Sequence, residues 1–160
     1  MRVALAVVGR LKDGPERQLY DRYAQRFDAA GKGLALGPLM LAEIPEGRAG
    51  DAPSRQADES RRLLAHVADA TVRVVLDERG KSLTSADFAR QLGRWRDDGV
   101  PRLAFLIGGP DGHGAATLEA ATAKLSLGPM TLPHGLARIV LVEQLYRAAT
   151  ILSGHPYHRA

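Results

Sequence analysis

Residues 103–112, LAFLIGGPDG, join a short apolar run to a glycine-rich turn. The run does not alternate apolar and polar residues, which is typical of a strand covered by helices on both faces. Glycines that directly follow such a strand let a ligand approach the backbone, and open α/β sheets bind ligands at that edge. The segment therefore predicts a buried parallel strand followed by a ligand-binding turn, with an ordinary tight turn as the alternative. It lacks the dinucleotide fingerprint, because Pro110 stands where the second glycine is required.

Similar apolar runs and periodic patterns extend this reading along the chain. Three further runs predict strands, at Val3–Val8, Leu39–Ile44 and Val72–Leu76. Apolar residues spaced three or four apart predict five helices, at Pro15–Phe27, Ser54–Ala70, Thr84–Asp97, Gly114–Lys124 and His134–Leu152. Their alternation predicts an α/β fold, a parallel sheet with helices on both faces. No repeat or long linker divides the chain, so residues 1–160 are expected to form a single domain.

Composition narrows the class of function. The chain has no cysteine, which excludes disulfide scaffolds, thiolate zinc sites and cysteine nucleophiles. The net charge of +4 favours a polyanionic partner. The first apolar run is short and lacks a signal-peptide cleavage site, and no segment approaches the roughly 18 apolar residues of a membrane span. A cytoplasmic protein without membrane contact is expected.

Two other motifs favour ordinary structure over chemistry. Gly80-Lys81-Ser82 resembles the end of a phosphate-binding loop, but that motif needs a glycine where Val75 stands. The histidines do not form a convincing ligand set, so no metal is expected. His66 is read as a surface residue and His113 as a loop residue.

The C-terminal tail is unusual. Residues 154–160, GHPYHRA, concentrate groups that can stack on a base, move a proton and contact phosphate, although a solvated tail is the alternative. In the preceding helix, apolar residues occupy more of the circumference than one core contact requires. This predicts burial on two sides, with a second subunit as the other partner.

Four strings together resemble the ribosomal RNA large subunit methyltransferase H family of the SPOUT class. They are LIGGPDG at 106–112, LSLGPMTLPH at 125–134, RIVLVEQLYRA at 138–148 and HPYHR at 155–159. The resemblance spans nearly the whole chain. It implies a C-terminal trefoil knot, a homodimer and S-adenosyl-L-methionine as cofactor. The implied substrate is a pseudouridine in helix 69 of 23S rRNA, methylated at N3 on the assembled 70S ribosome.

The same resemblance implies a set of site residues. The cofactor pocket would be formed by Leu76, Gly108, Leu127, Gly128, Pro129, Met130, Thr131 and Leu132. In the tail, His158 would remove the N3 proton and Tyr157 would stack on or orient the base. Arg138 and Arg159 would contact phosphate or stabilise the developing anionic base, and His134 would order the cofactor loop.

The sequence departs from the family pattern at three positions. His113 stands where an apolar residue is expected, and Gly135 and Ala137 are smaller than expected.

Two other functions are alternatives. One is that of a SPOUT enzyme acting on another RNA such as tRNA, and the second is that of a non-catalytic, ribosome-associated RNA-binding protein. A Rossmann-type methyltransferase is disfavoured, because its glycine-rich loop would follow the first strand.

Overall fold

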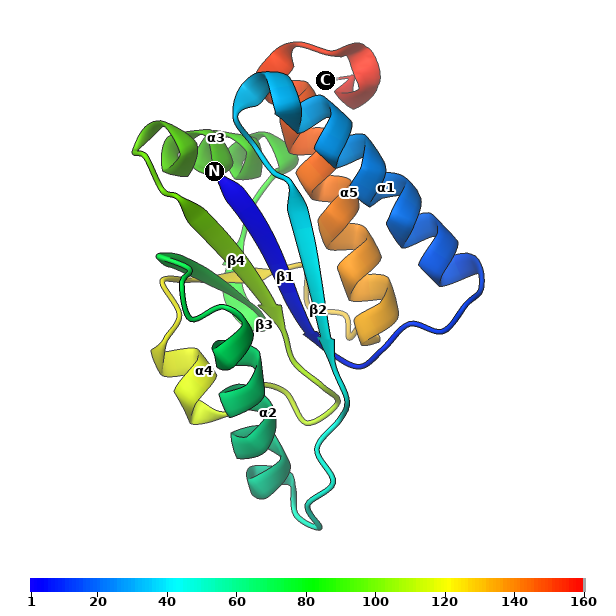
Figure 1. Cartoon of the computed structure of the whole chain (residues 1–160), viewed down its shortest axis with the longest axis vertical. Coiled ribbons are helices and arrows are strands. Elements are labelled where there is room, and N and C mark those ends of the chain that lie inside the picture. The colour runs from blue at the N-terminus through cyan, green and yellow to red at the C-terminus, as the bar shows by residue number, and fades with distance from the viewer. Residues whose placement is uncertain (160) are drawn as a thin grey trace.

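A five-stranded parallel sheet forms the centre of the computed structural model, which describes residues 1–159 (Figure 1). Its strand order is β2-β1-β4-β3-β5, and every neighbouring pair is parallel. The strands are β1 (Arg2–Val8), β2 (Leu39–Ile44), β3 (Val72–Ser82), β4 (Arg102–Ile107) and β5 (Ala123–Ser126).

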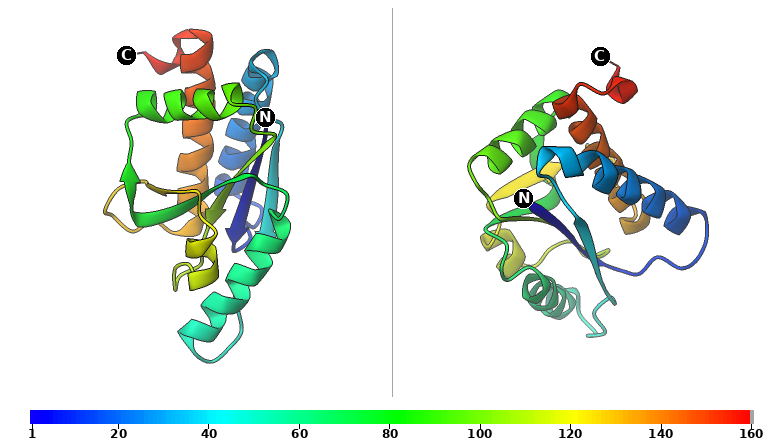
Figure 2. Two further views of the ribbon diagram at one scale, coloured as in Figure 1. Left: turned by 90° about the vertical axis from the view of Figure 1, so that its left-hand side faces the viewer. Right: turned by 45° about the horizontal axis from the view of Figure 1, so that its top comes forward.

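Helices cover both faces of this sheet, which confirms the predicted fold class (Figures 1 and 2). One layer contains α1 (Pro15–Gly31), α3 (Ser85–Asp97) and α5 (His134–Ser153). The other contains α2 (Ala52–His66) and the short α4 (Ala115–Glu119). Two 3-10 turns, η1 (Lys32–Leu34) and η2 (Pro156–His158), follow α1 and α5.

Burial on both faces explains why the strands read as continuous apolar runs. In β1, Val3, Leu5 and Val7 belong to the core under α1, α3 and α5. The intervening Ala4, Ala6 and Val8 belong to the core under α2 and α4. Because successive side chains point to opposite faces, both sets must be apolar.

The predicted helix Gly114–Lys124 is wrong beyond its first turns. The segment instead forms α4 and then β5, whose four residues AKLS pair with β3 at the edge of the sheet. A strand so short leaves no periodic pattern, and the alanines before it favour a helix.

Strand β3 is also longer than predicted, because its polar second half wraps closely around β5. Leu76 and Lys81 both align with Leu125, so residues 77–80 bend around that point. A Cβ on Gly80 would lie only 2.7 Å from the backbone carbonyl carbon of Lys124. Glycine at position 80 therefore allows a close approach of two backbones, and this explains the motif that resembled a phosphate-binding loop.

Side chains cap the first turns of α2 and α3. Asp51 accepts a hydrogen bond from the Ser54 amide at the start of α2, and Thr84 accepts one from the Asp87 amide at the start of α3. Within residues 1–159, none of the helices combines the length and apolar character needed to cross a bilayer.

Candidate functional site

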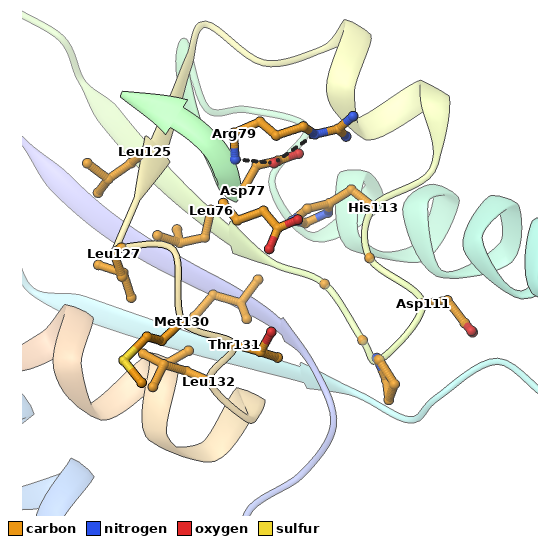
Figure 3. A pocket seen from close by; sticks show the side chains of 18 of the residues that line it. Leu76, Asp77, Arg79, Asp111, His113, Leu125, Leu127, Met130, Thr131 and Leu132 are labelled. Carbon is orange, nitrogen blue, oxygen red and sulfur yellow. Dashed lines mark hydrogen bonds and ion pairs between the residues drawn. The ribbon is translucent and has the colours of Figure 1, made fainter. Parts of the chain in front are cut away.

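A pocket of about 540 Å³ opens where the carboxyl end of β4 and the bend in the middle of β3 meet the loop that leads from β5 into α5 (Figure 3). Three segments supply most of its lining: Leu76–Arg79, Ile107–His113, and the bend at 127–132. Two strings far apart in the sequence, the glycine turn and the LGPMTL bend, thus meet in one cavity. Its size is typical of a site for a small molecule or cofactor.

Most residues predicted to bind a cofactor line this pocket. Among the described lining residues are Leu76, Gly108, Leu127, Gly128, Met130, Thr131 and Leu132. Pro129 lies in the same bend but is exposed and is not one of them. Met130 is 83% exposed and Leu132 37% exposed. Apolar side chains held at the mouth of a pocket favour a ligand or partner that covers them.

The glycine turn lines the pocket on one side and contacts α2 on the other. Asp111 accepts a hydrogen bond of 2.8 Å from Nε of Arg55. The amide of Gly114 donates to Oγ of Ser60 at 3.1 Å, and a Cβ on Gly114 would lie 2.7 Å from that oxygen. Helix α2 therefore holds the turn rigidly at the rim, as a pre-formed binding site requires.

His113 is a pocket residue that sequence reasoning missed. Its ring is largely buried beside the backbone of Leu76 and Leu106 and lines the cavity (Figure 3). Neither ring nitrogen makes a hydrogen bond of ordinary geometry among the described residues. Burial lowers the pKa of His113, so the ring is neutral near pH 7. The sequence held no signal for this, because a histidine after a glycine turn reads as an exposed loop residue.

A buried ion pair fixes the start of α5. The guanidinium of Arg138 is fully buried and binds the carboxylate of Glu43, at the end of β2. It also donates to the carbonyl of Gly9 at 2.8 Å and contacts Nδ1 of His134 at 2.9 Å. The carboxylate of Glu43 receives the amide of Leu11 at 2.8 Å and the guanidinium of Arg17 at 2.7 Å.

These contacts decide the charge state of the cluster. Burial alone would raise the pKa of Glu43, but hydrogen bonds from Leu11, Arg17 and Arg138 lower it below its usual value. The pair therefore stays ionised. The guanidinium of Arg138, which was expected to contact phosphate or to stabilise the anionic base, is buried in this structure and faces Glu43 and Gly9. Its neighbour His134, at the start of α5, packs its ring against Gly9.

The C-terminal tail lies along the other end of α5 (Figure 1). The hydroxyl of Tyr157 donates to Glu143 at 3.1 Å, its ring centroid is 4.5 Å from that of Tyr146, and the guanidinium of Arg147 lies over it. His158 is half-buried and Arg159 is exposed. Within the described residues, none from 154 to 159 lines the pocket.

One chain therefore brings the predicted cofactor residues together but leaves Tyr157, His158 and Arg159 apart from them. The described chain also contains no group of three His, Asp or Glu side chains arranged to hold a metal.

Comparisons with known proteins place this fold in a class. Residues 1–158 match the family described as "Predicted SPOUT methyltransferase". Among solved structures, a probable methylase family protein from Haemophilus influenzae superposes with a TM-score of 0.55 at 11% identity, covering 99% of this chain and 70% of that one. A probable methyltransferase from Bordetella pertussis gives 0.53 at 18% identity, covering 92% and 96%. At such low identity these structures support the fold.

Sequence relatives are much closer. A protein named ribosomal RNA large subunit methyltransferase H from Bradyrhizobium diazoefficiens is 53% identical over 160 residues, covering 100% of both chains. A protein of the same name from Afipia carboxidovorans is 51% identical over the same span. The chain belongs to the ribosomal RNA large subunit methyltransferase H family of SPOUT methyltransferases.

The ion pair at the start of α5 makes a prediction about stability. Glu43→Gln leaves the buried guanidinium of Arg138 without a carboxylate, so the free energy of unfolding should fall by about 3 kcal/mol. Urea denaturation followed by circular dichroism measures this loss.

Asp58→Asn is the matched control, because Asp58 also binds two arginines, Arg61 and Arg62, but at the surface of α2. That change should cost less than about 1 kcal/mol. Equal losses for the two variants would contradict a special role for the buried pair.

Proposed function

We propose that this protein transfers a methyl group from S-adenosyl-L-methionine to N3 of a pseudouridine in helix 69 of 23S rRNA, on the assembled 70S ribosome. The observation that carries the proposal is the meeting of the glycine turn and the LGPMTL bend in one pocket. The names of the relatives support a ribosomal RNA substrate, and the basic net charge of +4 suits a polyanion.

The pocket suits the proposed cofactor. Leu76, Leu127, Met130 and Leu132 form apolar walls for an adenine ring, and the exposure of Met130 is explained if a ligand covers it. Asp77 places a carboxylate in the lining, and hydrogen bonds from Arg79 lower its pKa and keep it ionised. A fixed negative charge is favourable beside a sulfonium. When bound, the cofactor supplies an activated methyl group, and the residues of the chain hold and orient it.

The tail residues are proposed to act in a partner subunit. The described tail does not line the pocket of its own chain, which supports a second copy as the source of a base at His158. Leu136 and Val140, which are 44% and 38% exposed on α5 near the pocket, offer an apolar surface for such a partner. We infer a homodimer in which the partner's tail completes each site.

The chemistry assigns distinct work to the tail. N3 of pseudouridine carries a proton, so a positioned base must remove it before the nitrogen can attack. General-base catalysis is worth typically ~10²–10⁴-fold. His158 would take this proton, Tyr157 would orient the base by stacking, and Arg159, which is exposed, would contact phosphate. Arg138 would act only by holding α5 in place.

The knotted path of the class is also part of the proposal. Residues 77–80 bend closely around Leu125, and α5 is the next element after that strand. This tight wrap supports a C-terminal segment threaded through the preceding chain.

Cofactor binding tests the pocket. Met130→Ala removes an apolar wall, so affinity for S-adenosyl-L-methionine should fall about tenfold by isothermal titration calorimetry, which corresponds to ~1.4 kcal/mol. Met40→Ala is the matched control, because Met40 is 53% exposed on β2 and lies outside the pocket. Equal effects from the two changes would contradict the assignment of this pocket to the cofactor.

Methyl transfer tests the substrate. With labelled cofactor, 70S ribosomes should accept the methyl group at one pseudouridine of 23S rRNA, while free 50S subunits and tRNA should accept far less. Transfer chiefly to tRNA would favour the first alternative. Cofactor binding without transfer to any RNA, or no cofactor binding at all, would favour a non-catalytic RNA-binding protein.

Mixed dimers test the composite site. Two variants should each be inactive alone. One lacks residues 155–160. The other carries Thr131→Trp, in which an indole at an exposed lining position blocks the pocket. After dissociation and random reassociation, about a quarter of the sites should combine an intact pocket with an intact tail, restoring about a quarter of the activity. A mixture as inactive as its parents would place each site within one chain.

A further inference from the structure

A second cavity, of about 560 Å³, lies between α3 and the edge of the sheet formed by β3 and β5. It shares only Leu125 with the lining of the cofactor pocket. Its charged and aromatic lining consists of Lys81, Asp87, Phe88, Arg90, Arg94, Trp95 and Lys124. Neither the family pattern nor the proposed reaction gives these residues a role.

The positive charge of this cavity is largely uncompensated. Asp87, its one carboxylate, is already bound to Arg90 and to the hydroxyl of Thr84. Within residues 1–159, Lys81, Arg94 and Lys124 make no ion pair. Three such cations around one hollow repel each other, and a bound polyanion would offset that repulsion.

Trp95 adds a surface for stacking. It lies on α3, packs partly against the hydrophobic core, and lines the cavity with its remaining surface. Cations that follow a backbone, combined with an aromatic ring that accepts a base, are the usual elements of a binding site for single-stranded nucleic acid. A duplex presents its bases stacked inside the helix and would leave the indole without a role.

The cavity also lies beside the cofactor pocket. A smaller hollow of about 290 Å³ shares Ser82, Leu83, Phe88 and Leu125 with the cationic cavity. It shares Leu125, Leu127 and Gly128 with the cofactor pocket. Because these hollows share lining residues, the two cavities are neighbours, which fits their occupation by one RNA strand.

We propose that this cavity binds an unpaired nucleotide of the RNA substrate, with its base against Trp95 and its flanking phosphates on Lys81, Arg94 and Lys124. The proposal rests on the proposed function in taking RNA as the partner. It adds a second RNA contact that positions the strand beside the reacting base.

Trp95 is the only tryptophan in the chain, so its fluorescence reports on this cavity directly. Titration of the intact protein with single-stranded hexauridylate should quench the emission in a saturable manner. In the double variant Arg94→Gln/Lys124→Gln, the apparent affinity should fall at least about tenfold. The slope of log K against log salt should become shallower by about 1.4, since each phosphate contact on a single strand contributes about 0.7.

Arg61→Gln is the matched control, because Arg61 is exposed on α2, which covers the opposite face of the sheet from α3. It should leave the quenching unchanged. Absence of quenching, equal quenching by inorganic polyphosphate, or a double variant that binds like the wild type would each overturn the proposal.

The test is independent of the enzymatic assignment. Binding of S-adenosyl-L-methionine to the double variant should match the wild type, since neither changed residue lines the cofactor pocket. Quenching by RNA without methyl transfer to any RNA would leave the cavity assignment standing and remove the proposed reaction. Methyl transfer without quenching would do the reverse.

Discussion

The buried contact between Arg138 and Glu43 is the interaction on which the site depends. It joins the first turns of α5 to the end of β2, and through the carbonyl of Gly9 to the end of β1. Because α5 directly follows the bend at 127–132, fixing its first turns also fixes that bend over the glycine turn. Arg17 and the Leu11 amide complete the environment of the carboxylate, so the buried guanidinium and the partly buried carboxylate are both compensated.

The helices on the two faces of the sheet hold different parts of the pocket. On one face, α5 is packed between α1 and α3 and carries the ion pair at its start and the tail at its end. On the other face, α2 holds the glycine turn through Arg55 and Ser60. The pocket therefore forms between two elements that are anchored independently, at the carboxyl edge where parallel sheets commonly bind ligands.

How much of this fold is readable from sequence depends on burial. Strands such as Val3–Val8 are covered on both faces, and their unbroken apolar character predicts a parallel sheet with helices on either side. Strand β5 has only four residues and lies at an edge, and the second half of β3 is polar. Their sequences therefore look like a short helix or a loop and do not predict strands. Their pairing depends on the close approach of Gly80 to Lys124, a tertiary contact with no local signature.

Some features of the site could be predicted from the sequence and others could not. Most of the pocket lining could be predicted because the glycine turn and the LGPMTL bend are contiguous strings, carried over from a family resemblance. The burial of Arg138 could not be predicted, since an arginine in a largely apolar helix gives no sign of its partner Glu43, 95 residues away in the chain. Nor could the inward placement of His113, or the separation of the tail from the pocket of its own chain.

The most direct test of this account is a crystal structure of the protein grown with S-adenosyl-L-methionine. The account predicts the adenosyl group between residues 108–113 and 127–132, with the Arg138–Glu43 contact intact and the tail of a partner subunit beside the methyl group. A cofactor bound elsewhere, or a pocket closed by the tail of its own chain, would contradict it.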